Sequence, residues 1–347
     1  MQSKNEALDR IFMISERMIV FDGLDDVFEH IVKTAVALTQ AEAATIRVFD
    51  IETGTLNIVK GYGVTEGFLS QPPIRVGEGI TGTVVQTRKS FSSTNVADDP
   101  VCKHNELARL EGIRSIISVP MNTKNSSIGC ITVYRKSQDT FTDHELMLLS
   151  IFSTEAVQAV EKSQLLKELK AQATQDHLTG LWNKKEFTNK LALEIERNKR
   201  HNQSLAVMFI DLDEFKSFND THGHLMGDKL LHDFTKILQQ HCRKIDIIGR
   251  FGGDEFVIIA PQTNRDGASK LAMKLCHATA NHNFLNSKVG TYTNINCSIG
   301  VTIQSSKSTV NSLLEEADKA LYESKKNGRN QVTLFEDLYT NQKVISV

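Results

Sequence analysis

Apolar residues recur at helical spacing through the first forty residues of the chain. They are Leu8, Ile11, Phe12, Ile14, Met18 and Ile19, followed by Val27, Phe28, Ile31, Val32 and Ala35. Their spacing predicts two amphipathic helices. Short β-like stretches follow at residues 44–49, 55–62, 115–120 and 128–134, and a glycine-punctuated segment at 76–82 leads into a predicted helix that ends at Thr87. This order predicts a small α/β domain.

Residues 141–173 contain almost no glycine or proline and keep an apolar stripe along their length. The stripe comprises Leu149, Phe152, Ala156, Ala159, Leu166, Leu169 and Ala173. This pattern predicts one long helix. Its spacings of three and four are typical of a coiled-coil seam, interrupted at Ser163, so a dimerising connector is one interpretation. The alternative is a surface helix packed on its own domain.

After Asp176 the pattern alternates between helix and strand. Residues 205–210 form a continuous apolar run that ends in acidic residues, which is typical of a buried strand. Residues 247–251 and 256–260 flank a Gly-Gly-Asp-Glu turn and predict a hairpin. A strand at 295–303 and a helix at 310–326 complete the pattern. The predicted fold class is α/β (α+β), with a mixed, mainly antiparallel sheet flanked by helices.

Size and charge limit what the chain can be. Its 347 residues exceed what one core usually serves, so two domains and a connector are expected. A formal net charge of -2 excludes a generic nucleic-acid binder, and we expect no DNA partner. Five scattered cysteines favour neither a zinc site nor a disulfide framework. Without an apolar run long enough for a signal peptide or a membrane span, the expected location is cytoplasmic.

Two predicted strand ends carry acidic residues. Asp211 and Asp213 follow one strand, and Asp254 and Glu255 lie in the hairpin. Each group alone is typical of an ordinary turn. Together they could hold a hard divalent cation, because magnesium is commonly shared between one or two carboxylates and substrate phosphates. That is the chemistry of phosphoryl or nucleotidyl transfer.

Residues 176–335 resemble a GGDEF domain, the catalytic domain of diguanylate cyclases. The signature is Gly252-Gly253-Asp254-Glu255-Phe256. Four further blocks accompany it in order: Asp176 to Asn183, Phe209 to Asp220, Gly223 to Asp228, and Ala317 to Tyr322 with Lys325 and Gly328-Arg329-Asn330. Five ordered motifs over about 160 residues are far more specific than any single short pattern.

The resemblance implies condensation of two GTP molecules into cyclic di-GMP by a homodimer, with Mg²⁺ or Mn²⁺ as cofactor. The implied metal ligands are Asp211, Asp254, Glu255 and the backbone carbonyl of Leu212, and the implied catalytic residues are Asp254, as proton acceptor, and Glu255. Guanine recognition falls on Asn219 and Asp228, with His224 nearby. Phosphate binding falls on Lys216, Lys325 and Arg329. We expect Lys325 and Arg329, four residues apart, to face one site from a helix end.

A short motif upstream of the hairpin resembles the inhibitory product site of the same family. Arg243 and Asp246 form an Arg-x-x-Asp motif, which five residues separate from Gly252. The alternative is a local surface ion pair, which typically contributes little. At the level of the whole chain, the alternative to an active cyclase is a receptor that binds GTP or cyclic di-GMP without turnover.

Residues 22–163 resemble a GAF domain, a sensor of small molecules. The resemblance lies in residues 76–82, Ser118-Val119-Pro120, Ile128-Gly129 and residues 141–143. The ligand is open. Arg135-Lys136, Phe141 and Glu145 match in part a pattern of cyclic-nucleotide-binding members, so cyclic AMP, another metabolite or a ligand-free dimerisation role are the alternatives. The predicted organisation is an N-terminal helix at 1–21, a sensory domain at 22–152, a signalling helix at 153–175 and a cyclase domain at 176–340.

Overall fold

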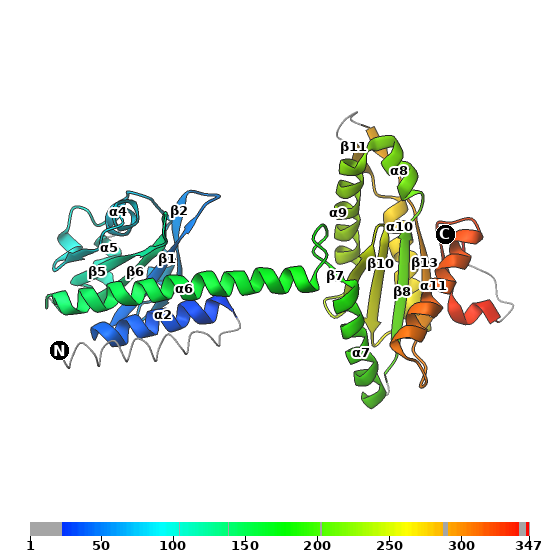
Figure 1. Ribbon diagram of the computed structural model, residues 1–347, viewed down its shortest axis with the longest axis horizontal. Coiled ribbons are helices and arrows are strands. Elements are labelled where there is room, and N and C mark those ends of the chain that lie inside the picture. The colour runs from blue at the N-terminus through cyan, green and yellow to red at the C-terminus, as the bar shows by residue number, and fades with distance from the viewer. Residues whose placement is uncertain are drawn as a thin grey trace. The chain divides into compact units, whose positions relative to one another are not determined.

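The computed structural model describes residues 23–103, 105–137, 139–201, 203–286, 291–339 and 345–346. The helix expected at residues 1–21 lies outside these ranges. The chain divides into two compact units, residues 1–169 and 170–347, which Figure 1 shows together. No helix within the described ranges is both long enough and apolar enough to cross a membrane.

The first unit is built on a six-stranded antiparallel sheet with the order β3-β2-β1-β6-β5-β4. Its strands are β1 (Ala43–Asp50), β2 (Thr55–Tyr62), β3 (Ile74–Arg75), β4 (Phe91–Ser93), β5 (Ser115–Asn122) and β6 (Ser127–Arg135). Helix α2 (Leu24–Thr39) and the first part of α6 (Asp143–Thr174) pack on one face through a core that includes Ile31, Ile46 and Phe152. The other face is covered by α3 (Glu66–Leu69), α4 (Gly79–Thr87), η2 (Val96–Asp98) and α5 (Asn105–Leu110).

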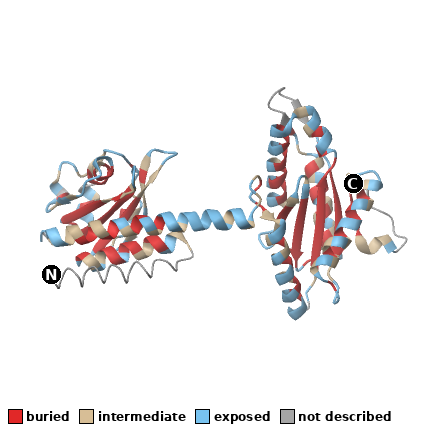
Figure 2. Cartoon of the chain, viewed as in Figure 1, coloured by how far each residue is buried: buried red, intermediate tan, exposed pale blue. Residues whose placement is uncertain are grey.

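Helix α6 confirms the single long helix that the apolar stripe predicts. It runs for 32 residues, and the boundary between the units falls inside it, after Leu169. Its first half is anchored by buried residues from Leu148 to Val160. Beyond that point it is exposed, as Figure 2 shows, and Leu165, Leu166 and Leu169 are 55%, 50% and 52% exposed. These three leucines, the α6 leucines, are not buried by the chain's own core.

The second unit holds a seven-stranded mixed sheet with the order β15-β14-β13-β8-β10-β9-β7. The strands are β7 (Trp182–Asn183), β8 (Leu205–Leu212), β9 (Ile247–Gly252), β10 (Glu255–Pro261), β13 (Cys297–Ile303), β14 (Gln331–Leu334) and β15 (Ile345–Ser346). β8 pairs antiparallel with β10 and β13, and β10 pairs antiparallel with β9. Two pairings are parallel, β13 with β14 and β7 with β9. A short hairpin, β11 (Phe284–Asn286) and β12 (Thr291–Thr293), stands apart.

Helices cover both faces of this sheet. Alternate residues of β8 explain the layers, because successive side chains of a strand point to opposite faces. Met208 and Ile210 join the core under α8 (Phe215–His222), α9 (His224–His241) and α10 (Arg265–Ala280). Val207 and Phe209 join the core under α7 (Lys184–His201) and α11 (Val310–Lys326). A 3-10 helix, η3 (Phe335–Tyr339), follows β14.

Candidate functional site

The acidic residues come together at one end of the central strands. Continuing the alternation of β8, Asp211 lies on the face of Val207 and Phe209, which is the face that α11 covers. Glu255 begins β10 and is paired in register with Asp211. Directly paired residues place their Cβ atoms about 5 Å apart on one face of the sheet. The structure therefore brings Asp211 and Glu255 side by side, with Asp254 in the adjoining turn.

A lysine from α11 neutralises the buried Asp211. Lys325 Nζ lies 2.7 Å from Asp211 Oδ2, and the Asp211 side chain is only 9% exposed. Burial raises the pKa of Asp211 to about 6, Lys325 opposes the rise and the charge of Asp254 adds to it. The pKa of Glu255 is also raised, by partial burial and by Asp254. The site thus concentrates negative charge that a cation would stabilise.

Asp213 has a structural role that separates it from Asp211. Ser298 Oγ on β13 donates to Asp213 Oδ1 at 2.8 Å, and the backbone N–H of Asn330 donates to Asp213 Oδ2 at 3.0 Å. Both carboxylate oxygens are therefore engaged within the unit. This geometry supports Asp211, rather than Asp213, as the acid available to a ligand.

Arg250, which lies outside the five sequence motifs, holds the hairpin. Arg250 donates through Nε and Nη2 to the carbonyl oxygen of Gly253, at 3.0 and 2.7 Å, and through Nη1 to Asp176 Oδ1 at 2.8 Å. Asp176 Oδ1 also accepts from the backbone N–H and the hydroxyl of Thr179. The Arg250 clamp, meaning Arg250 with Gly253 and Asp176, ties the turn that carries Asp254 to the turn that opens this unit.

The donor set at this edge fits a hard divalent cation shared with substrate. Asp211, Asp254 and Glu255 supply carboxylate oxygens, which magnesium and manganese prefer. Within the described residues, no three His, Cys, Asp or Glu side chains are arranged to hold a metal. A site of one or two carboxylates completed by phosphates needs no such triad. Leu212 is buried at the end of β8, and its backbone nitrogen lies 3.4 Å from the carbonyl oxygen of Asp254.

The predicted guanine residues lie on the α8–α9 helix pair. Asn219 Oδ1 is buried and has no hydrogen-bond partner among the described residues. A Cβ at Gly227 would lie 1.8 Å from this oxygen, so the glycine makes room for the Asn219 amide. Asp228, the next residue, is exposed near the start of α9. The Asn219 amide therefore lies against Gly227, the residue that precedes Asp228.

The basic residues predicted at the GTP site lie on different elements. Lys216 on α8 and His224, the first residue of α9, are both exposed. Helix α11 ends at Lys326, and Arg329 lies beyond it with φ of 63°. The Asn327-Gly328 turn ends the helix between Lys325 and Arg329, yet the charges of both residues act on Asp213.

Arg243 and Asp246 form a closed turn between α9 and β9. The N–H of Arg243 donates to Asp246 Oδ2 at 2.7 Å, and the N–H of Asp246 donates to the carbonyl oxygen of Arg243 at 2.9 Å. Arg243 Nη2 lies 3.3 Å from Asp246 Oδ1 and donates to Thr263 Oγ1 at 2.5 Å. The local ion pair of the alternative interpretation is present, but the Arg243 side chain is 52% exposed.

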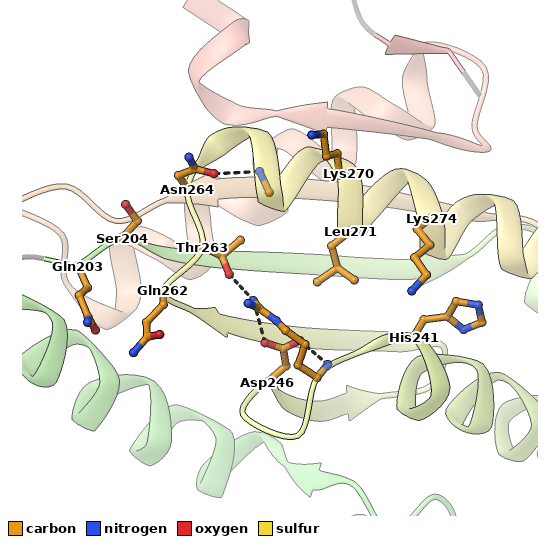
Figure 3. A pocket seen from close by; sticks show the side chains of 12 residues that line it. Gln203, Ser204, His241, Asp246, Gln262, Thr263, Asn264, Lys270, Leu271 and Lys274 are labelled. Atoms are coloured by element: carbon orange, nitrogen blue, oxygen red, sulfur yellow. Dashed lines mark hydrogen bonds and ion pairs between the residues drawn. The ribbon is translucent and has the colours of Figure 1, made fainter.

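This turn also borders a cavity of about 610 Å³. Figure 3 shows the cavity between α10, which carries Lys270 and Lys274, and the turn that carries Asp246. His241, Gln262 and Thr263 complete much of the wall. The cavity lies where β8 and β9 begin and β10 ends, opposite the edge that carries Asp211. At about 3.3 Å per residue, strands of six to eight residues separate the two ends by about 20 Å or more.

In the first unit, the residues that suggest a cyclic nucleotide contact one another. Arg135 forms an ion pair with Glu145, its guanidinium lies 4.1 Å from the centre of the Phe141 ring, and Nη2 donates to the carbonyl oxygen of Thr39 at 2.8 Å. These contacts hold the junction of β6 and α6. None of the three residues lines either of two cavities in this unit, one beside Arg47 and one beside Asn122.

Comparisons with known proteins agree with the two units. Residues 173–331 match the family model described as diguanylate cyclase, GGDEF domain, and residues 22–161 match the GAF domain model. Diguanylate cyclase A of Treponema denticola is 33% identical over 252 residues, which is 70% of this chain and 64% of that protein. Diguanylate cyclase DgcS of Shewanella oneidensis is 37% identical over 164 residues, 47% of this chain and 53% of that protein. The chain thus spans less than two thirds of these relatives.

A solved structure shares the fold of the second unit. The coiled coil and GGDEF domain of DgcB from Caulobacter crescentus, in complex with c-di-GMP, superposes with a TM-score of 0.51 and 25% identity. The match covers 54% of this chain and 98% of that one.

Proposed function

Because the chain carries a GAF domain followed by a GGDEF domain, we propose that it is a diguanylate cyclase that condenses two GTP molecules into cyclic di-GMP and two pyrophosphates. The observation that carries the proposal is the pairing of Asp211 and Glu255 across β8 and β10, beside Asp254 and within reach of Lys325. Such an edge concentrates hard oxygen donors where a triphosphate can complete a metal site.

The chain's own residues divide the reaction between them. Asp254 accepts the proton of the 3′-hydroxyl of one GTP, whose oxygen bonds to the α-phosphorus of the second GTP as pyrophosphate leaves, and the same exchange repeated closes the ring. Asp211, Asp254, Glu255 and the carbonyl of Leu212 would hold Mg²⁺ or Mn²⁺, which when bound supplies charge neutralisation at the phosphates.

Lysine and arginine side chains hold the triphosphate. Lys325 already approaches Asp211, and Lys216 and Arg329 are exposed and available to phosphate oxygens. Cations aimed at the triphosphate stabilise the charge that develops on the leaving pyrophosphate.

Guanine specificity is assigned to the α8–α9 helix pair. Asp228 accepts from the N1 and N2 donors of guanine, the Asn219 amide serves the remaining edge, and His224 lines the same side. Gly227 supports this assignment, because the lack of a Cβ there leaves room for the Asn219 amide beside Asp228.

Catalysis requires two subunits, since one GGDEF domain binds one GTP and the product contains two. The α6 leucines offer an apolar stripe for pairing two copies of the chain. A GAF ligand that favours one arrangement of the paired helices would then control how often two cyclase sites face each other.

Product inhibition is assigned to the 610 Å³ cavity beside Arg243 and Asp246. Cyclic di-GMP carries two phosphates and two guanines, and this cavity offers Arg243, Lys270 and Lys274 for the phosphates, while Asp246, whose side chain is 0% exposed, holds Arg243 in place. Because the cavity lies at the opposite end of the strands from Asp211, product bound there would lower turnover without competing directly for GTP.

Purified chain incubated with GTP and MgCl₂ tests the proposed reaction. We expect cyclic di-GMP and pyrophosphate to appear in a ratio of about one to two, as the balanced reaction requires. Binding of GTP with neither product would instead support a receptor without turnover.

A further inference from the structure

The GAF unit contains a cavity of its own. It has a volume of about 60 Å³ and lies on the face of the sheet opposite α2 and α6. Its apolar wall includes Phe68, Ile80, Ile113 and Tyr134. Most of this wall is buried core, so the cavity is a small, partly open pocket.

A buried arginine lines this cavity. Arg47 on β1 is 3% exposed and lies on the same face of the strand as Thr45, whose hydroxyl bonds to Tyr134. Its Nη1 donates to the carbonyl oxygen of Leu56 at 3.2 Å, and its Nη2 donates to Gln71 Oε1 at 2.8 Å. Both acceptors are uncharged, and no carboxylate of the described residues forms an ion pair with Arg47.

A guanidinium in that position is costly to the free protein. Burial lowers the pKa of Arg47, yet an arginine side chain keeps its proton in proteins. A buried charge without a counter-ion is strongly destabilising, so such charges are normally paired. The geometry therefore leaves a place for a negative charge next to Arg47.

Two further polar groups in the same wall have no partner. Gln71 Nε2 and Thr81 Oγ1 are buried and lack a hydrogen-bond partner among the described residues. Thr81 is 7% exposed and lies in the first turn of α4, where backbone N–H groups also lack partners within the helix. Arg47, Gln71 and Thr81 thus bring polar groups from separate segments to the wall of one small cavity. A ligand there should be an acceptor, and a negatively charged one.

We infer that the GAF cavity binds a small carboxylate, with the carboxylate group on Arg47, Gln71 and Thr81 and a short carbon chain against Phe68 and Ile80. Arginine presents a planar fork that matches a carboxylate in two hydrogen bonds. The volume of about 60 Å³ suits an acid of two to four carbons, whereas drug-sized ligands occupy about 300 Å³ or more. A cyclic nucleotide, with its base and ribose, exceeds this space.

This inference names the ligand class in the proposed control of the cyclase. Only the effect on cyclase activity rests on the proposed function, because binding is measured without GTP. Thermal unfolding of the full chain would be followed with acetate, propionate or pyruvate, with propionamide as the uncharged counterpart of propionate, and with nitrate and cyclic AMP. We expect concentration-dependent stabilisation by at least one of the carboxylates, because a ligand that binds only the folded state raises its stability. Propionamide should have no effect.

Two variants distinguish recognition from general stability. Arg47→Met removes the buried charge and keeps a similar volume, so the free protein should remain folded or gain stability while carboxylate affinity falls roughly a hundredfold. Arg75→Met, an exposed arginine of the same unit outside the cavity wall, should bind as the unchanged chain does.

Several outcomes would overturn the inference: equal carboxylate binding by Arg47→Met, equal stabilisation by propionamide, no stabilisation by any of the three acids at 100 mM, or stabilisation by cyclic AMP or nitrate alone. Loss of binding would leave cyclase activity to be judged by its own assay, and an inactive cyclase would leave the binding result standing.

Discussion

Replacing Arg250 by lysine tests whether the Arg250 clamp positions the catalytic turn. Arg250 makes two hydrogen bonds to the carbonyl oxygen of Gly253 and an ion pair with Asp176. Lysine keeps the charge but cannot present a planar fork to both partners. Losing one charge-assisted hydrogen bond should lower the free energy of unfolding by about 1.5 to 3 kcal/mol. A domain with typical stability of about 5 to 15 kcal/mol stays folded.

The activity should fall more than the affinity for GTP. Asp254 follows Gly253 directly, and misplacing a reacting group by about 1 Å can reduce the rate about a hundredfold. The guanine residues lie on α8 and α9, away from the clamp. We therefore expect kcat for Arg250→Lys to drop by about ten- to a hundredfold with KM for GTP nearly unchanged.

Urea unfolding can be followed through Trp182, the single tryptophan of the chain, which lies in β7 of the cyclase unit. Arg197→Lys is the matched control, because Arg197 is 62% exposed on α7 and forms only a surface ion pair with Glu194. Wild-type stability and wild-type kcat in Arg250→Lys would refute the role of the clamp. An equal loss in Arg197→Lys would also refute it.

The pH dependence of the same clamp gives a second readout. Burial alone would raise the pKa of Asp176, but hydrogen bonds from Thr179 and Arg250 outweigh it and hold the pKa below 3.8. A lowered folded pKa means that this stabilisation is present above about pH 4 and is lost as the pH falls through the folded value. Asp176→Asn should be destabilised at pH 7 and should lose that part of the acid dependence. An acid unfolding profile identical to wild type would contradict this.

Three further predictions concern the other sites. Gly227→Ala places a Cβ against Asn219 Oδ1. The fold should persist, but KM for GTP should rise and discrimination against ATP should weaken. Unchanged selectivity in parallel GTP and ATP assays would count against the base pocket. Arg243→Ala should keep the initial rate and weaken cyclic di-GMP inhibition by about one to two decades, and identical inhibition curves would favour a local ion pair. Two residues inserted after Ser163 rotate the downstream part of α6 by about 200°, so basal activity and ligand response should change; if neither changes, the helix is a passive tether.

The sequence predicts the acidic edge because alternation along a strand is a local property. The apolar run at 205–210 and the Gly-Gly turn predict a strand and a hairpin, and the structure has both. Alternation places Asp211 and Asp213 on one face but does not distinguish them. The family resemblance favours Asp211, and the physical reason lies in Ser298 and the backbone of Asn330, which are far away in the chain and engage Asp213.

Features that depend on long-range contacts escape the sequence pattern. Arg250 reads as an ordinary strand residue until Asp176, 74 positions earlier, is placed beside it. The parallel pairing of β13 with β14 likewise depends on how α11 crosses between them. The buried Arg47 lies in a mostly apolar strand, but its cavity is made by residues from several other helices, strands and loops of the GAF unit. Local spacing carries no information on such partners.

The most direct test of the account compares cyclic di-GMP synthesis by the wild type, Asp254→Ala and Glu315→Ala with GTP and Mg²⁺. Glu315 is exposed on α11, so its variant controls for the loss of one acidic residue. We expect product from the wild type and Glu315→Ala, and none from Asp254→Ala, with matching unfolding curves for all three. Near wild-type synthesis by Asp254→Ala, or no synthesis by the folded wild type, would contradict the assignment of the acidic edge as a diguanylate cyclase site.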